Sequence, residues 1–598
     1  MLKSSDTRAR IEALRGAMQD AGLAGWAVPI ADAHMSEYVG DDAQRLAWLT
    51  GFTGSAGSAV VLHDKAALFV DGRYTQQAVE QVPADLFEHL DTPRHSMTSY
   101  LAEHVCGGDV IGYDPWLHPR TWVRDTGKAI AQIGAQLQPL EQNLIDTLWV
   151  GRPARPQHPA VPYAPHYAGQ SRADKLQTMA QSLRQSGADM AVIASLDGVA
   201  WSLNIRGRDI PNSPVSFGFF VLKADASATV FLGEDAVTAA LKDDLGAEVA
   251  LADYDDFAAA LAAMIDAGRR VLLDPQTAVA AIFEIVAGAG GHILEGREPS
   301  TLPKACKNPV EQDGARAAHV RDGAAMCRFL SWFDGAAPAG ELTELAVADQ
   351  LARERMRLDL FQDLSFRTIS AAAHHAALPH YSVTQHSNIA VPPNGLFLID
   401  SGAQYLDGTT DITRTIQVGE ISQEAKRRYT QVLKGHIAVA TARFPAGTPG
   451  RAIDTLARMA LWADGTDFDH GTGHGVGSYL HVHEGPQKIA KAASDEPLRP
   501  GMIVSNEPGY YKPGSFGIRI ENLVIVQPMP HAGDEREMYG FETITFAPID
   551  RRPIVNDLLT ADEVAWLDQY HARVFEKLHT DLDEATLSWL KRNTRPLF

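Results

Sequence analysis

Five residues in the last third of the chain have side chains that could together hold two metal ions. They are Asp400, Asp411, His474, Glu507 and Glu521. Four carboxylates and one imidazole form a hard, oxygen-rich ligand set, which suits Mn²⁺ or another divalent first-row ion better than a metal that prefers thiolates. Two such ions close together can share a hydroxide, polarise a carbonyl and supply a nucleophile near neutral pH. The ligand set therefore points to metal-assisted hydrolysis.

Strands and turns are predicted around all five ligands. GLFLIDSGAQY and TTDITRTIQV read as two strands joined through YLDG, whose Asp-Gly pair favours a tight reversal between Asp400 and Asp411. We expect Glu521 on another strand, GIRIENLVIV, and Glu507 at the end of a further strand, just before a Pro-Gly turn. His474 lies in GTGHGVG, which is too rich in glycine for a helix and predicts a loop with close backbone approach.

Three further histidines could handle protons beside such a site: His380, His470 and His483. In the segment HVHEGP, His481 and His483 would share one face of a strand. A lone histidine is more often a hydrogen-bonded structural residue. Near a metal site, however, neutral imidazoles can shuttle protons and bind a developing oxyanion.

A length of 598 residues predicts about three or four domains. A composition of 45% apolar and 21% charged residues is typical of a soluble globular protein. A net charge of −21 without any block of basic residues argues against binding to nucleic acid or to an anionic membrane. No apolar run approaches the ~18 residues of a membrane helix, and we expect no secretion signal. Three widely separated cysteines without a CxxC pair favour a reducing cytoplasm.

The first two-fifths of the chain contains an internal repeat. RIEALRGAMQDAGLAGWAVP and RADKLQTMAQSLRQSGADMAVIA both read as an amphipathic helix closed by glycine and followed by a short apolar strand, and strand-like runs come after each. The proline-rich stretch 151–166 reads as a linker, and a helical pattern begins after Pro309. We therefore predict three domains, 1–155, 156–303 and 304–598, with every metal ligand in the last.

The motifs IDSG, TTDITRT, HGTGHGVG, NEPG and IRIEN occur in this order. This order resembles the pita-bread metallopeptidase superfamily. With HGTGHGVG and NEPGYY, the chain is most similar to the aminopeptidase P (Xaa-Pro aminopeptidase) family in its long, three-domain cytosolic form. The resemblance extends over essentially the whole chain. It implies a mixed α/β (α+β) fold, in which two creatinase-like N-terminal α/β domains precede a pita-bread catalytic domain and a C-terminal helical tail.

The resemblance also implies a role for each metal ligand. Asp400 would be a terminal ligand of one ion, His474 and Glu507 would bind the other, and Asp411 and Glu521 would bridge the pair. Glu507 would also help to activate the hydroxide that lies between two ions, most simply Mn²⁺.

Six residues would then act on the substrate or support the ligands. His483 would be the proton shuttle and His470 a contact near the scissile bond, while Arg519 would hold carboxylates in place. The remaining members of this substrate-handling set are His380, Tyr511 and, on the substrate's exit side, Arg73 of the N-terminal DGRY.

The implied reaction is release of the N-terminal residue from a peptide whose second residue is proline, by a cytoplasmic homodimer. Prolidase is the nearest alternative, although it usually lacks the middle domain. Methionine aminopeptidase is far shorter and has no need of His380. A catalytically inactive pita-bread binding module is the third alternative, and it would not require an intact ligand set.

Overall fold

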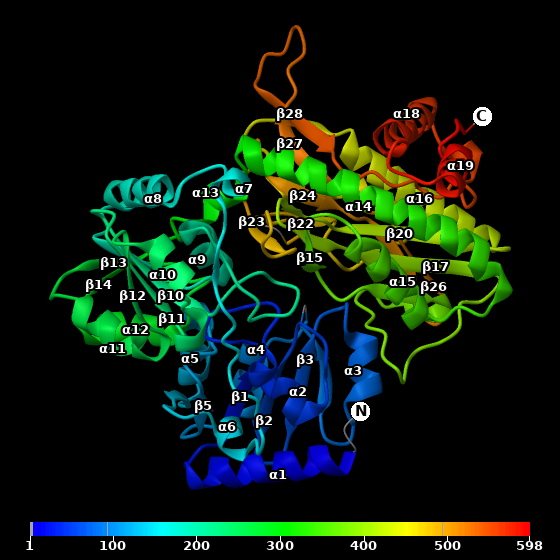
Figure 1. The fold of residues 1–598 in the computed structure, drawn as a ribbon. Coiled ribbons are helices and arrows are strands. Elements are labelled where there is room, and N and C mark those ends of the chain that lie inside the picture. Colours follow the sequence, from blue (N-terminus) through cyan, green and yellow to red (C-terminus); the bar gives the residue numbers. More distant parts are fainter. Residues whose placement is uncertain (1–3, 93, 493, 598) are drawn as a thin grey trace. The chain divides into compact units, whose positions relative to one another are not determined.

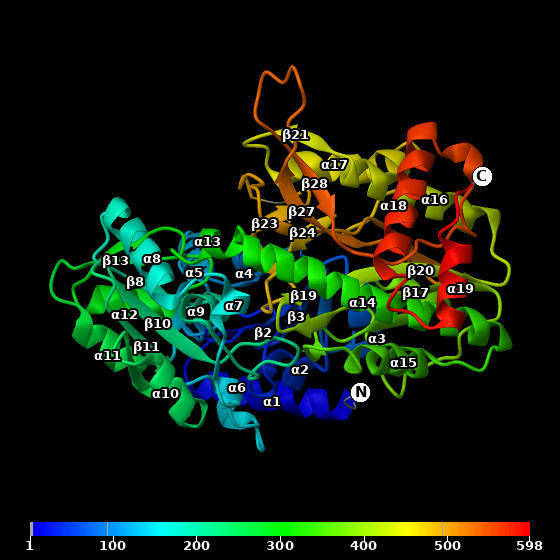
Figure 2. The same ribbon diagram turned by 45° about the horizontal axis from the view of Figure 1, so that its top comes forward.

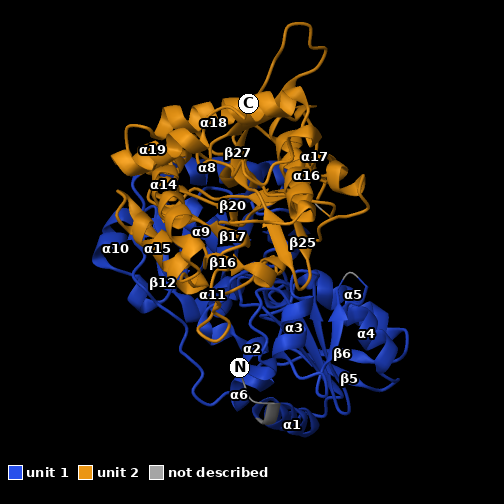
Figure 3. Cartoon of the chain, turned by 90° about the vertical axis from the view of Figure 1, so that its right-hand side faces the viewer, with its two compact units in different colours: residues 1–164, 170–301 blue, residues 165–169, 302–598 orange. Residues whose placement is uncertain are grey.

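The computed structural model describes residues 4–92, 94–492 and 494–597 (Figure 1). The chain forms two compact units, one of residues 1–164 and 170–301 and the other of residues 165–169 and 302–598 (Figure 3). Among the described residues, no helix combines the length and the apolar content needed to cross a membrane.

The first unit contains two six-stranded sheets with the same topology. Their orders are β4-β3-β2-β1-β5-β6 and β12-β11-β10-β8-β13-β14. In each sheet the first strand of the repeat pairs antiparallel with one neighbour and parallel with the other. The strands of the first sheet are β1 (Gly25–Pro29), β2 (Ser58–Leu62), β3 (Ala66–Val70), β4 (Glu88–Asp91), β5 (Val110–Tyr113) and β6 (Gln136–Pro139). Those of the second are β8 (Met190–Ile193), β10 (Gly218–Lys223), β11 (Ala228–Leu232), β12 (Val249–Asp253), β13 (Arg270–Leu273) and β14 (His292–Glu295). The predicted internal repeat is therefore confirmed.

Helices flank both sheets of this unit. The two that open the repeats, α1 (Ser4–Asp20) and α8 (Arg172–Ser186), each end near a glycine with positive φ, which stops the helix at little steric cost. The others are α2 (Arg45–Thr50), α3 (Thr75–Gln81), α4 (Met97–His104), α5 (Arg120–Ala131), α6 (Leu144–Leu148), α9 (Leu196–Leu203), α10 (Ala239–Leu245), α11 (Phe257–Met264) and α12 (Ala280–Gly288). Between the repeats, residues 151–160 have no regular structure, as a linker predicts, and β7 (Val161–Pro162) pairs with β9 (Ile205–Arg206).

The second unit combines antiparallel strands with long helices. The helix predicted after Pro309 is α14 (Pro309–Ala336), whose first turn is closed by a capping box between Asn308 and Glu311. The other main helices are α15 (Glu344–Met356), α16 (Gln423–Ala440) and α17 (Gly450–Trp462). Two sheets carry the ligand segments, with orders β16-β17-β20 and β21-β28-β27-β24-β22-β23.

The strands of this unit are short, and several begin or end within two residues of a ligand. Their bounds are β15 (Phe361–Leu364), β16 (Ile369–Ala372), β17 (Gly395–Ser401), β18 (Ala403–Tyr405), β19 (Gly408–Thr409), β20 (Ile412–Val418), β21 (Arg443–Pro445), β22 (Gly473–Gly475), β23 (Glu484–Ile489), β24 (Ile503–Asn506), β25 (Gly509–Lys512), β26 (Phe516–Arg519), β27 (Asn522–Pro528) and β28 (Met538–Thr543).

Side-chain alternation along β17 decides which residues meet the helices. Phe397 and Ile399 belong to the large apolar core that also contains Phe333 of α14 and Val432 of α16. Leu398 belongs to a smaller cluster on the opposite face. Because side chains alternate along a strand, Asp400 shares the face of Leu398 and points away from the helix-packed core.

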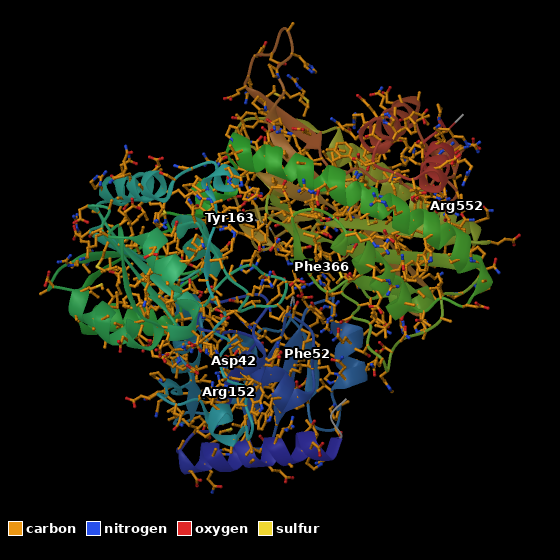
Figure 4. The ribbon with its side chains drawn as sticks, viewed as in Figure 1. Asp42, Phe52, Arg152, Tyr163, Phe366 and Arg552 are labelled. Atoms are coloured by element: carbon orange, nitrogen blue, oxygen red, sulfur yellow. The ribbon has the colours of Figure 1, made fainter. Side chains whose placement is uncertain are left out.

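The C-terminal tail forms the two predicted helices, α18 (Ala561–Leu578) and α19 (Glu584–Asn593). They lie beside α16 and the end of α14 (Figure 2). Asp334, near the end of α14, accepts a hydrogen bond from Nε1 of Trp589 at 2.7 Å and pairs with Arg552, labelled in Figure 4, at 3.0 Å. The tail is thus packed on its own unit.

Buried histidines should make the protein sensitive to acid. Burial lowers the pKa of His319 on α14 to about 4, whereas an unfolded histidine titrates near 6.5. Between these values the unfolded state binds more protons, so the free energy of unfolding falls as the pH falls from about 6.5 to about 4. We expect His319→Asn to remove about 2–3 kcal/mol of this loss. Urea unfolding of the EDTA-treated protein at pH 7 and pH 4.5 measures it.

The exposed His166 provides the matched control, since His166→Asn should leave the difference between the two pH values as in the wild type. Equal acid sensitivity of His319→Asn and the wild type would contradict the prediction.

Candidate metal centre

Asp411, His474 and Glu521 each place one ligand atom within 4.8 Å of the others. Nε2 of His474 lies 3.5 Å from Oδ2 of Asp411 and 3.4 Å from Oε1 of Glu507. Asp400 joins the group through Arg519, whose guanidinium donates to its Oδ2 at 2.6 Å. The five predicted ligands therefore form one cluster, although they are up to 121 residues apart in sequence.

A hairpin brings Asp400 and Asp411 together, as predicted. β17 and β20 pair antiparallel with Asp400 opposite Thr413, and Asp411 directly precedes β20. The connecting segment turns at Leu406 and Asp407, because Tyr405 pairs with Gly408. The Asp-Gly pair thus lies at the reversal.

His474 lies on a short strand, so the predicted loop is wrong. β22 pairs with both β23 and β24 in the six-stranded sheet. The predicted close backbone approach is nevertheless present. A Cβ on Gly473 would lie 1.9 Å from the carbonyl oxygen of Ser505, and one on Gly475 would lie 2.3 Å from that of Glu484. Because glycine has no Cβ, Gly473 and Gly475 allow β22 to pack this closely against the neighbouring backbone.

Glu521 lies between two strands, so the single predicted strand GIRIENLVIV is also wrong. β26 pairs with β25 in a two-stranded ribbon, whereas β27 belongs to the six-stranded sheet. At the junction, the backbone N–H of Glu521 donates to the carbonyl oxygen of Thr413 at 3.1 Å. The chain therefore changes sheets at the ligand itself. Glu507 directly follows β24 and precedes Pro508, as predicted.

Two of the predicted substrate-handling histidines lie near the ligands. The ring of His483 is 4.3 Å from that of His474, measured between centroids. Residues 481–483 do not form the predicted strand, because β23 begins only at Glu484. Nε2 of His470 lies 2.7 Å from the hydroxyl of Tyr511, and that hydroxyl accepts a hydrogen bond from Arg519 at 2.6 Å.

The other two predicted substrate residues, His380 and Arg73, belong to segments of the sequence that carry no predicted ligand. His380 is half-buried in the loop after the short turn η5 (Ala373–Ala377), which packs on β26. In the same loop, Tyr381 stacks on His375, whose Nδ1 is 2.8 Å from a carboxylate oxygen of Glu344. Arg73 belongs to the first unit, where it pairs with Asp71 at 2.7 Å. Its role at the substrate stays a prediction.

Buried carboxylate oxygens without partners show that the cluster fits cations. Among the described atoms, Oδ1 of Asp400, Oδ1 of Asp411 and Oε1 of Glu521 are buried and accept no hydrogen bond. Such groups are costly to bury unless something compensates them. Divalent ions coordinated by these oxygens would compensate them.

The charges of the cluster lead to the same conclusion. Burial, followed by the nearby charge of Glu521, raises the pKa of Glu507 to about 7. Burial and neighbouring carboxylates also raise the pKa of Asp411 and of Glu521 well above their usual values. The geometry of His474 also suits a metal ligand. The carbonyl oxygen of Gly475 lies 2.9 Å from Nδ1, so Nδ1 donates to it, and Nε2 is the atom that faces the carboxylates and could bind a cation through its lone pair.

Two hydroxyl groups that were not predicted hold the ligands in place. Thr413 donates to Oε2 of Glu521 at 2.8 Å and accepts from Nε of Arg519 at 3.2 Å. Ser505 accepts the backbone N–H of His474 at 2.9 Å and donates to Oε1 of Glu507 at 3.2 Å. The only available signal was position, since Thr413 lies in TTDITRT and Ser505 two residues before Glu507.

Models of known protein families match four successive segments of the chain. A model of metallopeptidase family M24 matches residues 313–528, and one of its C-terminal region matches residues 537–597. Two models of creatinase/prolidase N-terminal domains match residues 10–148 and 151–311.

Relatives of the same length include proteins named Xaa-Pro aminopeptidase P. A probable Xaa-Pro aminopeptidase P of Coccidioides posadasii (strain RMSCC 757 / Silveira) is 39% identical, over 99% of this chain and 100% of its own. Another from Aspergillus niger is 38% identical over 100% of both chains. The crystal structure of X-prolyl aminopeptidase from Caenorhabditis elegans, described as a cytosolic enzyme with a di-nuclear active site, has a TM-score of 0.95. It is 33% identical and covers 99% of each chain. The chain belongs to the Xaa-Pro aminopeptidase P family of M24 metallopeptidases.

Proposed function

We propose that this chain is a metal-dependent aminopeptidase that releases the N-terminal residue from peptides with proline in the second position. The observation that carries the proposal is the cluster of Asp411, His474 and Glu521, to which Glu507 and Asp400 are joined through His474 and Arg519, with three unpartnered, buried carboxylate oxygens among the described atoms. The names of the whole-length relatives and the di-nuclear site of the C. elegans enzyme support the substrate class.

Two divalent ions are the implied cofactors, and Mn²⁺ suits the hard ligand set. Asp400, Asp411, His474, Glu507 and Glu521 would hold them. When bound, the ions would supply Lewis-acid polarisation of the scissile carbonyl and a hydroxide nucleophile near neutral pH.

The surrounding side chains would bind the peptide and move protons. Glu507 lies beside His474 and would accept the proton released from the attacking water. His483 lies against the same ring and would deliver a proton to the departing nitrogen, while His470, oriented by Tyr511, would contact the peptide near that bond.

Peptide selection would depend on both ends of the scissile bond. The free α-amine of the first residue would pair with Asp400. Proline as the second residue has no N–H, so the protein needs no acceptor there and can shape an apolar ring pocket instead. We assign His380 and Arg73 to the peptide side of the site on the motif resemblance alone.

We also propose the bounds of the three domains and a cytoplasmic location. We retain the division 1–155, 156–303 and 304–598, which the two separate sheets of the first unit support. A cytoplasmic location is supported by the description of the C. elegans enzyme and by three unpaired cysteines, Cys106, Cys306 and Cys327.

Substrate choice tests the proposal directly. With Mn²⁺ added, we expect the protein to release arginine from Arg-Pro-Pro and to hydrolyse the dipeptide Gly-Pro far more slowly, measured by chromatography of the products. Preferred hydrolysis of Gly-Pro would indicate a prolidase. Absence of turnover in a protein that has bound metal would indicate a binding module.

Removing a carboxylate charge should remove metal. We expect Asp411→Asn and Glu521→Gln each to lower the metal content from two ions per chain to one or none, because each residue is assigned to both ions. The value of kcat/KM should fall by about 10³-fold or more. Elemental analysis of dialysed protein measures the metal.

Asp407→Asn is the matched control, because Asp407 lies in the same hairpin but pairs with Arg321. Loss of metal in this control and not in the two ligand variants would refute the assignment.

We also propose a homodimer, on the motif resemblance and not on a contact of the structure. Light scattering at micromolar concentration should give twice the chain mass of 64.8 kDa. A peak at the mass of one chain would remove the claim.

A further inference from the structure

Two lysines and one glutamate form a buried charge cluster in the second unit. Nζ of Lys304 lies 2.9 Å from Oε2 of Glu484, and Nζ of Lys307 donates to Oε1 of the same carboxylate. The three side chains are 4%, 1% and 0% exposed, respectively. We call these three residues the Glu484 cluster. None of them belongs to the metal-ligand set or to the predicted substrate-handling set.

Burial makes this cluster hard to rearrange. Taking an ammonium or a carboxylate out of water costs several kcal/mol unless an opposite charge is in contact with it. Glu484 is the shared acidic partner of both lysines, so rotating its side chain away would weaken two buried ion pairs at once. The side chain of Glu484 is therefore held in one orientation.

The main chain of Glu484 is held as well. Glu484 is the first residue of β23 and pairs with Gly475 of β22. The two backbones are so close that a Cβ on Gly475 would lie 2.3 Å from the carbonyl oxygen of Glu484. Gly475 directly follows the ligand His474. Glu484 is thus fixed on one side by the lysines and on the other by the strand that carries a metal ligand.

His483 directly precedes this fixed residue. Residues 476–483 form neither helix nor strand, so His483 is the last residue of an irregular segment. Its ring packs against the ring of His474 with 4.3 Å between centroids and an interplanar angle of 70°. Because His483 is bonded directly to Glu484, holding Glu484 in place restricts where the backbone of His483 can lie, and the ring of His483 packs on His474 from that position.

We propose that Glu484, clamped by Lys304 and Lys307, is a positioning residue that holds the imidazole of His483 beside the metal ligand His474. The proposal rests on the proposed function, because it gives that imidazole its proton-transfer role. Glu484 itself would contact neither the peptide nor the ions. Its effect on turnover would pass entirely through His483, and this makes the proposal testable by a double-mutant cycle.

The cycle compares Glu484→Gln, His483→Ala and the double variant, all loaded with Mn²⁺ and assayed on Arg-Pro-Pro. We expect Glu484→Gln to lower kcat by about 10- to 100-fold, with KM changed by less than about twofold, because a small displacement of a reacting group is costly. Metal content should stay at two ions. The double variant should be no slower than His483→Ala alone.

Glu563→Gln is the matched control. Glu563 of α18 pairs with Lys434 of α16 at 2.6 Å, so the substitution also takes a carboxylate from a lysine partner. It should leave kcat unchanged in the wild-type background and in the His483→Ala background. If Glu484→Gln destabilises the fold, a variant that combines Glu484→Gln with Lys304→Met takes its place in the cycle. The combined variant has the same net charge in the cluster as the wild type.

Multiplicative losses in the double variant would overturn the proposal, because Glu484 would then act independently of His483. Wild-type kcat in Glu484→Gln would overturn it as well. If the wild type does not cleave Xaa-Pro peptides, the proposed function fails. The positioning claim is then decided by NMR of the assigned His483 imidazole, whose resonances should shift in Glu484→Gln and not in Glu563→Gln. Unchanged resonances would refute it.

Discussion

Mutual repulsion among four closely spaced carboxylates, three of them buried and that of Glu507 17% exposed, is the constraint on which the second unit depends. Asp400, Asp411, Glu507 and Glu521 lie close together, and the guanidinium of Arg519 pairs with Asp400 at 2.6 Å. Buried charges of one sign are unstable without counter-charge. Divalent ions would remove that instability, so the same arrangement that strains the metal-free protein creates affinity for metal. Folding and cofactor binding are linked through one electrostatic cause.

The scaffold resists this repulsion by taking the ligands from stiff, separately supported places. Asp400 and Asp411 come from one hairpin, His474 from a strand of another sheet, Glu507 from just beyond the end of the neighbouring strand, and Glu521 from the point where the chain crosses between sheets. Short hydroxyl side chains then fix the carboxylate oxygens without adding charge. Glycine is required where strands crowd together, and this explains the unusual composition of GTGHGVG.

A second electrostatic device supports the histidines. Buried ion clusters are placed beside the residues that would handle protons, as the Glu484 cluster is beside His483. Similarly, Arg458 pairs with Asp454 at 2.7 Å and donates to the carbonyl oxygen of His470 at 2.8 Å. In both cases a charge pair that cannot easily rearrange restricts the backbone of a histidine. The cost of burying these charges is thus coupled to the geometry that the proposed reaction needs.

The sequence by itself predicted the five candidate ligands, the hairpin that joins Asp400 to Asp411, the repeated α/β units and the long helix after Pro309. Each of these follows from local rules, namely turn residues, capping, side-chain periodicity and metal-ligand chemistry. Only the tertiary structure decided that His474 lies on a strand, that GIRIENLVIV breaks at Glu521 and that residues 481–483 form no strand. It also revealed Thr413, Ser505 and Glu484. These features depend on which strands become neighbours, and that is set by long-range packing, which leaves no periodic signal in the residues themselves.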